Sequence, residues 1–244
     1  MNEKQARSEL TPDGPAAAAL KEKLCACIRM MAMEGLLDFN GHVSARLPGE
    51  RLLINSRYST RAGVTPEQIV IADMDCNLLE GTDEPPSETV IHTEIYRRRP
   101  DVHSVAHLHP QYATLFTIAG VPLVPVYIVA SLFGEDGVPL FDDPRLIRQP
   151  EEGRAVAAAL GDKPALLLRA HGAVTVAPDI EGVFAVSYAM EDNARKALWA
   201  SALGTPSPLS AAEMAQYGAP VSSRGTKHKI WNFHVEKAKA TGWL

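Results

Sequence analysis

The sequence predicts an α/β fold, a sandwich whose central sheet is largely antiparallel. A helical segment opens the chain, short strand-like segments follow in close succession, and later helices are interspersed among strands without regular βα alternation. A doubly wound parallel fold would need that alternation. With 244 residues, 46% of them hydrophobic, the chain is long enough for one large domain with a substantial core.

The first elements can be read from the N-terminal third of the chain. Residues 1–14 are rich in charge and end in TPDGP, so we expect a flexible arm ahead of a single domain at 15–244. A strongly helical pattern covers residues 16–37. Short strands are then expected at 39–47, at 51–56 and, as a pair around an Asp-containing turn, within 69–81.

A helix is expected over residues 84–99, because two prolines exclude helix before it and Ser87 is a candidate N-cap. The later elements follow in order: a strand at 102–109 ended by Pro110, a helix at 111–120 closed by Gly120, a strand at 123–131, a helix within 144–160, two strands with a tight turn at His171–Gly172 within 165–178, and a long amphipathic helix at 179–204 capped by Asp179. The polar tail at 205–244 has aromatic anchors and is expected to pack on the body or on a neighbouring subunit.

Composition excludes several classes of function. The net charge is −5 and the basic residues are scattered, so no nucleic-acid surface is expected. No apolar run reaches the roughly 18 residues of a membrane span. The start of the chain lacks a secretory signal pattern, and the three cysteines form neither a metal-binding spacing nor an even set for disulfides. A cytoplasmic protein without a membrane partner is expected.

Two histidines separated by one residue lie in an apolar strand-like segment, DVHSVAHLHP. Side chains at i and i+2 of a strand share a face, so His107 and His109 point together. The pair alone fits a metal clamp and a hydrogen-bonded core pair equally well. His171 favours the metal, because it lies at a buried strand end with Gly172 leaving space beside it. Three neutral imidazoles with an open fourth position are typical of a catalytic site.

Glu88 is the candidate acid/base next to these histidines. It lies in the expected first turn of the helix after EPPS, where a carboxylate suits the helix dipole. From the sequence alone, the simpler interpretation of Glu88 as an ordinary helix-start residue is favoured. His92, four residues further on the same helical face, is expected to be a structural partner rather than a metal ligand.

Three segments together resemble the class II aldolase/adducin family over roughly residues 18–200. They are FNGHVSARL, PPSETVIHTEIYRRRPDVHSVAHLHPQYATLF and LLLRAHGAVTVAPDIEGVFAVSYAMEDNARKA. The resemblance implies a three-layer α/β/α sandwich with a mostly antiparallel sheet, and a homotetramer with its site at a subunit interface. It assigns His107, His109 and His171 as metal ligands and Glu88 as the acid/base. Zinc is the default ion for three histidines, with Mn²⁺, Co²⁺ or Fe²⁺ as alternatives.

The chain departs from the phosphate-binding members of that family where they bind phosphate. Gly41-His42-Val43-Ser44 replaces Gly-Asn-x-Ser, Arg57 and Tyr58 replace Thr-Gly, and Pro86-Ser87 replaces Ser-Ser. A phosphate cradle needs small residues and free backbone N–H groups, which proline and bulky side chains remove. The changed positions favour a carboxylate, and the GHVS variant resembles the branch of hydroxyaromatic-acid decarboxylases such as 3,4-dihydroxyphthalate decarboxylase.

The resulting hypothesis is a lyase of aromatic compound catabolism that decarboxylates a hydroxylated aromatic, or similar, carboxylic acid through a metal-stabilised enolate. Glu88 would move the proton, and would work best if burial raised its pKa toward neutrality. The expected substrate-binding residues are His42, Ser44, Arg57 and Ser87, although Arg57 could equally be an ordinary surface residue. Further residues whose roles stay open are Asn40, Tyr127, Tyr217 and His228.

Two alternatives to decarboxylation stay open at this point. The first is a retro-aldolase acting on a non-phosphorylated hydroxy-keto acid, since aldol cleavage uses the same enolate chemistry. The second is a non-catalytic, adducin-like interaction protein. Because adducin-like members lack the metal ligands and this chain has all three, an enzyme is the favoured interpretation.

Overall fold

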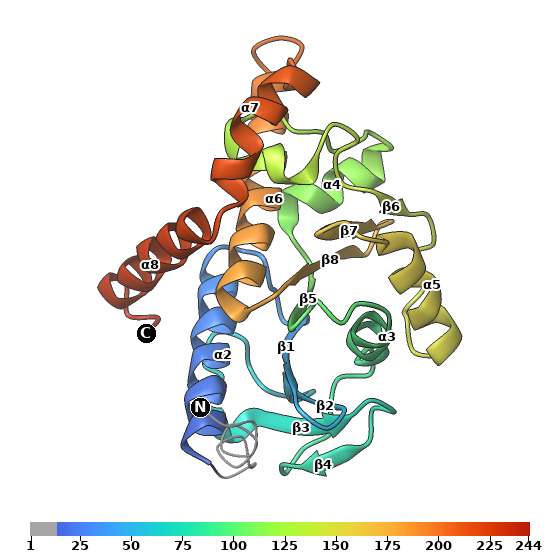
Figure 1. The fold of residues 1–244 in the computed structure, drawn as a ribbon, viewed down its shortest axis with the longest axis vertical. Coiled ribbons are helices and arrows are strands. Elements are labelled where there is room, and N and C mark those ends of the chain that lie inside the picture. The colour runs from blue at the N-terminus through green and yellow to red at the C-terminus, as the bar shows by residue number, and fades with distance from the viewer. Residues whose placement is uncertain (1–13) are drawn as a thin grey trace.

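The computed structural model describes residues 14–244, which are built around one eight-stranded sheet (Figure 1). The strands lie in the order β4-β3-β2-β1-β5-β8-β7-β6. All neighbours pair antiparallel except β6 and β7, which confirms the largely antiparallel sheet. The strands are β1 (His42–Leu47), β2 (Arg51–Asn55), β3 (Ile69–Asp73), β4 (Leu78–Glu80), β5 (Ser104–Leu108), β6 (Leu140–Phe141), β7 (Ala165–Leu168) and β8 (Gly172–Ala177). The arm expected at 1–14 falls, except for its last residue, outside the described residues.

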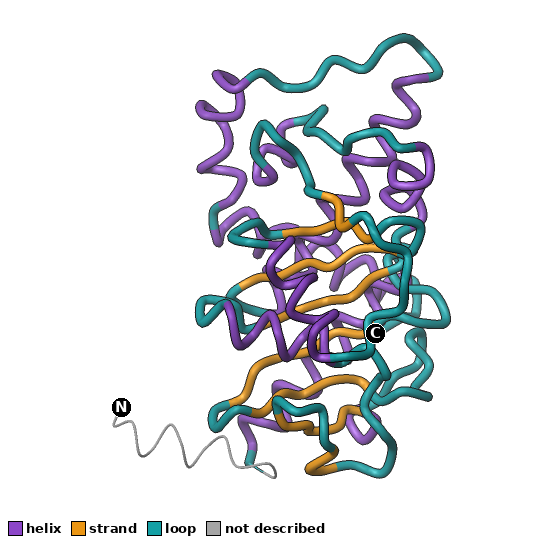
Figure 2. Tube along the Cα trace, turned by 90° about the vertical axis from the view of Figure 1, so that its right-hand side faces the viewer, coloured by secondary structure: helices purple, strands orange, loops and turns teal. Residues whose placement is uncertain are grey.

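Helices cover both faces of the sheet. The long helices α2 and α6 lie on one face, and α3 and α5 lie on the other (Figure 1). Figure 2, viewed from the side of α3 and α5, shows the strands one above another across the middle of the fold. The helices are α2 (Pro15–Met33), α3 (Val90–Arg98), α4 (Gln111–Ala119), α5 (Pro150–Leu160), α6 (Ile180–Ser201), α7 (Ala211–Ser222) and α8 (Arg224–Ala240), with two 3₁₀ turns, η1 (Pro66–Gln68) and η2 (Ile128–Phe133).

Alternation along each strand divides the apolar core into two. On β2, Leu53 packs with the α2 and α6 side, while Leu52 and Ile54 pack with the α3 and α5 side. The same division holds on β5, where Ala106 and Val105 face opposite cores. A sheet between two buried cores, each covered by helices, is the predicted three-layer sandwich.

The pairing of β1 with β5 places the site residues on the α3 face. His42 lies directly opposite His107 in the register, and Ser44 lies opposite Val105. Because Val105 belongs to the core beneath α3, the residues that alternate with it point to that helix as well. His107 therefore lies on the same face of the sheet as Val105.

Two local predictions are wrong. Residues 123–131 were expected to form a strand but form an irregular segment that leads into η2. Pro125 lacks a ladder N–H donor, and the side-chain amide of Asn193 bonds the flanking backbone instead, at 2.9 Å to Val124 O and 2.9 Å to Val126 N. Likewise, Ser87 does not cap the helix over 84–99, because α3 begins only at Val90.

The C-terminal segment forms two helices. α7 contacts η2, and α8 lies against α6 and α2. Trp231 and His234 of α8 are buried, and both rings pack against Phe184 of α6. None of the helices in residues 14–244 combines the length and the apolar character that crossing a membrane requires.

Candidate metal centre

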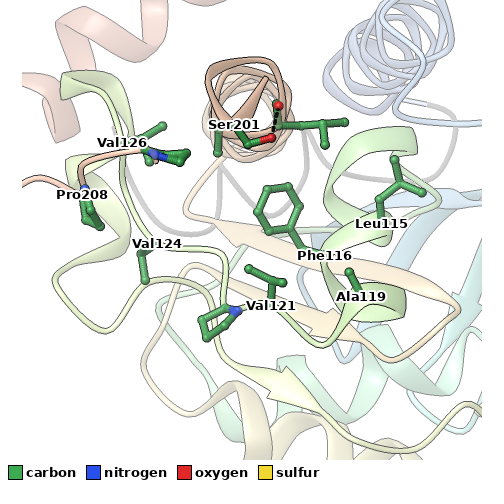
Figure 3. Close-up of a pocket in the computed structure, with 12 residues that line it drawn as sticks. Leu115, Phe116, Ala119, Val121, Val124, Val126, Ser201 and Pro208 are labelled. Carbon is green, nitrogen blue, oxygen red and sulfur yellow. Dashed lines mark hydrogen bonds between the residues drawn. The ribbon is translucent and has the colours of Figure 1, made fainter. Parts of the chain in front are cut away.

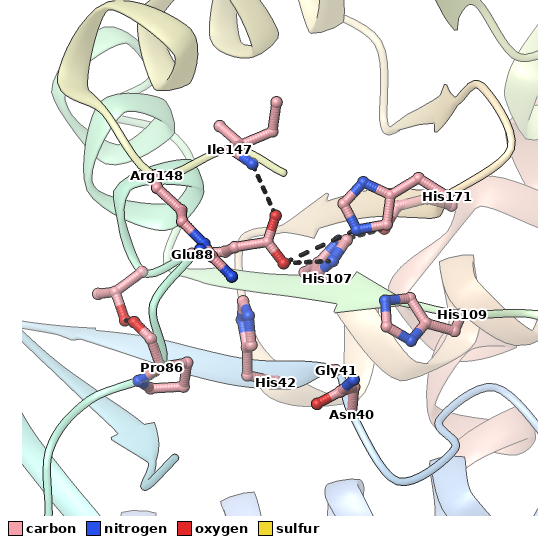
Figure 4. A network of polar contacts seen from close by, with 12 residues as sticks. Asn40, Gly41, His42, Pro86, Glu88, His107, His109, Ile147, Arg148 and His171 are labelled. Atoms are coloured by element: carbon pink, nitrogen blue, oxygen red, sulfur yellow. Dashed lines mark hydrogen bonds and ion pairs between the residues drawn. The ribbon is translucent and has the colours of Figure 1, made fainter. Parts of the chain in front are cut away.

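Three imidazoles converge at the ends of two neighbouring strands. His107 is near the end of β5, His109 follows that strand, and His171 directly precedes β8, which pairs with β5. One ring nitrogen from each lies within 4.8 Å of the others (Figure 4). Strand alternation sets the first two side chains on one face, and the turn before β8 brings the third to the same place.

The second ring nitrogens of two of these histidines are engaged by hydrogen-bond acceptors. His107 Nδ1 donates to the carbonyl oxygen of Ala173 at 3.2 Å, and His109 Nδ1 donates to Asp38 Oδ1 at 3.0 Å. A neutral imidazole that donates through Nδ1 presents a lone pair at Nε2. Neither Nε2 atom has a hydrogen-bond partner among the described residues, although both atoms are buried.

Buried polar atoms without a partner are rare, and each calls for a reason. Converging, orphaned imidazole lone pairs with acceptor-bound second nitrogens are the donor set that a divalent ion requires. Burial lowers the pKa of His107 to about 3, even though the nearby Glu88 carboxylate raises it, so this ring is neutral and able to ligate at neutral pH. The three histidines therefore fit a metal ion. The sequence did not predict the role of Asp38, because Asp38 is brought to His109 only by the fold.

Glu88 lies between this cluster and the loop before α5. Its Oε1 accepts a hydrogen bond from the Ile147 backbone N–H at 2.8 Å, while its Oε2 is 3.7 Å from Nε2 of both His107 and His171 (Figure 4). One carboxylate oxygen is thus held by the backbone and the other faces the metal ligands.

The pKa of Glu88 shifts in the direction opposite to the one the hypothesis required. Burial raises the pKa, but His171, His107 and the Ile147 N–H together outweigh burial and lower the pKa to about 2. Glu88 is a carboxylate at neutral pH, so it begins as a proton acceptor. In addition, it lies in the turn before α3 rather than within the first helical turn.

His42 is held by a chain of buried hydrogen bonds behind the metal ligands. Its Nδ1 is 2.7 Å from His92 Nε2, His92 Nδ1 is 2.7 Å from Ser44 Oγ, and Ser44 Oγ is 2.7 Å from the Tyr96 hydroxyl. All four side chains are almost fully buried, at 4% exposure or less. These hydrogen bonds fix the His42 ring, whose centroid is 5.1 Å from that of His107. The Nε2 atom of His42 is the ring nitrogen that they leave unused.

This series of hydrogen bonds changes the interpretation of Ser44 and His92. Ser44 was expected to bind substrate, but the structure places its hydroxyl between His92 and Tyr96, where it supports His42 instead. His92 was expected to partner Glu88, and it partners His42 and Ser44. Burial lowers the pKa of His92 to about 3, so the ring is neutral.

Of the four expected substrate-binding residues, Arg57 lines a hollow beside Asp38. This hollow has a volume of about 540 Å³ and includes Asn40, Arg57, Tyr58 and Arg61. Arg57 forms an ion pair with Glu84 at 2.6 Å, but its buried Nε has no partner among the described residues. The role of Arg57 as a substrate ligand therefore stays a prediction.

Arg61 is a second arginine of the hollow, and the substrate contact expected of Ser87 stays a prediction. Arg61 is buried and its guanidinium donates to the carbonyl oxygens of Gly41 and Ser59, so its donors are partly used. Ser87 is exposed and adjoins Glu88.

Three of the open candidates lie elsewhere in the chain. Tyr127 packs against Lys196, whose Nζ is 4.4 Å from the ring centroid. Tyr217 is on the surface of α7, and His228 of α8 bonds Glu181 at 3.0 Å. Their roles stay predictions.

A second hollow is apolar and lies between α4, the segment after it and the end of α6 (Figure 3). Its volume is about 360 Å³, and Leu115, Phe116, Val124 and Pro208 are among its lining residues. None of the site residues lines it, so it offers no converging polar groups for catalysis.

Known proteins resemble this chain in sequence and in fold. Residues 22–198 match the family described as class II aldolase and adducin N-terminal domain. A 3,4-dihydroxyphthalate decarboxylase of Arthrobacter keyseri is 31% identical over 177 residues, which cover 67% of this chain and 71% of that protein. The Rhodococcus jostii protein of the same name is 32% identical over 178 residues, covering 68% and 72%. An L-fuculose 1-phosphate aldolase from Glaciozyma antarctica superimposes with a TM-score of 0.81 at 24% identity, covering 92% of this chain and 90% of that one.

Proposed function

The chain belongs to the class II aldolase and adducin family, and from that premise we propose that it is a metal-dependent lyase that decarboxylates a hydroxylated aromatic carboxylic acid. The observation that carries the proposal is the position of Glu88 Oε2, 3.7 Å from Nε2 of both His107 and His171. Glu88, as a proton acceptor, would thus lie next to the histidines that hold the metal, on the side where a substrate oxygen would bind.

His107, His109 and His171 would hold the divalent ion, with zinc as the default for three histidines. Bound there, the ion would act as a Lewis acid that stabilises negative charge on substrate oxygens. The carbonyl of Ala173 and the carboxylate of Asp38 orient two of the rings for that task.

Glu88 would carry one proton through the reaction. Because its pKa is low, its Oε2 first accepts the proton of a substrate hydroxyl placed against the histidines. The bond between the ring carbon and the departing carboxylate then breaks, CO₂ leaves, and the electron pair stays with the ring. Glu88 returns the proton to that carbon, forming the new C–H bond. The Ile147 N–H holds the carboxyl in place throughout this cycle.

His42 would contact the substrate through Nε2 on the same face of the sheet. Its ring cannot turn without breaking the bond to His92, whose own ring is held by Ser44 and, through Ser44, by Tyr96. A histidine fixed in this way can recognise a substrate oxygen at low entropic cost. The position occupied by His42 adjoins Glu88 and His107, since these three residues offer atoms within 4.8 Å of one another.

The proposal is tested by incubating the zinc- or manganese-loaded chain with hydroxylated aromatic acids and measuring released CO₂ and aldehyde. We expect CO₂ without aldehyde, and loss of CO₂ release on Glu88→Gln with metal content unchanged. Aldehyde without CO₂ from hydroxy-keto acids would instead support the retro-aldolase. Absence of bound metal in the wild-type chain and in His107→Ala alike would refute both.

A further inference from the structure

Arg148 lies in the segment between β6 and α5, where two successive backbone N–H groups bind two carboxylates. Ile147 N donates to Glu88 Oε1 at 2.8 Å, and Arg148 N donates to Glu152 Oε2 at 2.8 Å. The side chain of Ile147 is fully buried. Since consecutive Cα atoms are about 3.8 Å apart, the backbone of Arg148 is fixed next to the peptide that holds the proposed proton acceptor.

The exposed side chain of Arg148 extends toward the candidate site. In Figure 4 it extends from its loop past Glu88 toward His42. Its guanidinium forms no hydrogen bond or ion pair with any residue of the described range 14–244, whereas Arg57 is paired with Glu84 and Arg61 is bonded to two carbonyl oxygens. Arg148 is thus the arginine at this site with all its side-chain donors available.

We propose that Arg148 binds a carboxylate of the substrate, an inference that rests on the proposed function. A planar guanidinium with free donors matches a carboxylate in bidentate geometry. The two backbone bonds fix where the side chain starts, so only the side chain itself has to become ordered when a ligand arrives. From the sequence, this role was expected of Arg57, which together with Tyr58 replaces Thr-Gly. Arg148 gave no comparable signal, because the neighbouring Ile147 meets Glu88 from 59 residues away.

The chemistry indicates which carboxylate Arg148 holds. A cation paired with the departing carboxylate would stabilise the substrate more than the transition state, because the charge leaves that group as neutral CO₂ forms. A cation paired with a carboxylate that stays on the ring stabilises both states equally and serves as an anchor. Arg148 therefore selects a hydroxylated aromatic dicarboxylic acid, whose product keeps one carboxylate.

Binding measurements test the anchor separately from turnover. Catechol and the two vicinal dihydroxybenzoates, 2,3- and 3,4-dihydroxybenzoate, share the chelating oxygens, and only the acids carry a carboxylate. Their Kd values would be measured by calorimetry on zinc-loaded wild type, Arg148→Met, Arg148→Lys and Arg98→Met. Arg98 is a matched control, since it is exposed, lies at the far end of α3 and has no side-chain partner among the described residues.

We expect at least one dihydroxybenzoate to bind the wild type more tightly than catechol. Arg148→Met should remove that difference, a loss of roughly tenfold or more in Kd for a charge-assisted contact, with catechol unchanged. Arg148→Lys should keep part of the affinity difference between the acid and catechol. Arg98→Met should keep all of it. Equal effects on acids and catechol, or no effect on either, would overturn the Arg148 assignment while leaving the proposed function intact. Failure of every ligand to bind the loaded wild type would overturn both.

Discussion

Replacing Gly172 by alanine should separate the two strands that carry the metal ligands. A Cβ atom at this position would lie 2.1 Å from the backbone oxygen of Leu108 and 2.9 Å from Cδ2 of His109, whereas ordinary contact begins at 3.4 Å. Leu108 is paired with Ala173 in the ladder between β5 and β8, so the obstacle is backbone and cannot rotate away. The strands must part by more than 1 Å at this point.

This displacement has two consequences that can be measured separately. Overpacking of this kind costs about 1–3 kcal/mol of stability. Metal geometry tolerates much less movement, because ligand distances are held to within about 0.2 Å. We therefore expect Gly172→Ala to remain folded by circular dichroism, to unfold at a lower denaturant concentration, and to lose zinc on dialysis under conditions in which the wild type keeps it.

Gly204→Ala is the matched control, since nothing lies within 4 Å of a Cβ at that position. It should keep both the stability and the zinc content of the wild type. The reasoning fails if Gly172→Ala binds zinc with wild-type affinity, because the two strands would then tolerate the added methyl group without moving His109 and His171.

Three further outcomes follow from the site. Glu88→Gln should retain metal but lose about 10²- to 10⁴-fold in kcat, and a variant with wild-type turnover would show that Glu88 moves no proton. Asp38→Asn should weaken zinc binding about 10- to 100-fold, because the carboxylate orients His109; equal affinities in a competition titration would contradict this. Finally, the folded-state pKa of His92, about 3, lies below the roughly 6.5 of an unfolded histidine. As pH falls from 6.5, the unfolded chain takes up a proton that buried His92 does not, so His92 alone should lower the unfolding free energy of the metal-free protein by up to about 1.4 kcal/mol per pH unit. Burial lowers the pKa values of His42 and His107 as well, so His92→Asn should reduce the slope in denaturant titrations by about that amount without abolishing it.

Local periodicity was enough to predict the parts of the site that lie on one strand. The alternation that puts His107 and His109 on one face is a property of any strand, and the structure bears it out. It also predicted the turn that delivers His171. The irregular segment at 123–131 escaped prediction because its apolar run resembles a strand, while Asn193, distant in sequence, satisfies its backbone groups.

Contacts across the fold were beyond the reach of sequence patterns. Asp38 meets His109 from 71 residues away, and Ile147 meets Glu88 from 59 residues away. Neither contact leaves a spacing that could be recognised. The same limit explains the wrong direction of the Glu88 pKa: burial was foreseeable, but the backbone N–H and the histidines that outweigh it are brought in by other elements.

The division between strands and loops accounts for how this scaffold can change substrate without losing its chemistry. Of the candidate ligands, His107 lies on β5, while His109 and His171 directly flank the paired strands β5 and β8. Glu88 is held by the backbone N–H of Ile147, whose side chain is in the core, so these positions are fixed by the ladder and the core. Arg57 and Arg148 lie on loops at opposite sides of Glu88 in the sequence, and neither contributes to a core. We therefore expect substitution of a loop arginine to change which anion is held while the candidate metal ligands stay in register. Decarboxylation and aldol cleavage both leave an electron pair next to a substrate oxygen, so the same strand-borne residues can serve either reaction. The choice between them then depends on where the loops hold the carboxylate relative to the bond that breaks.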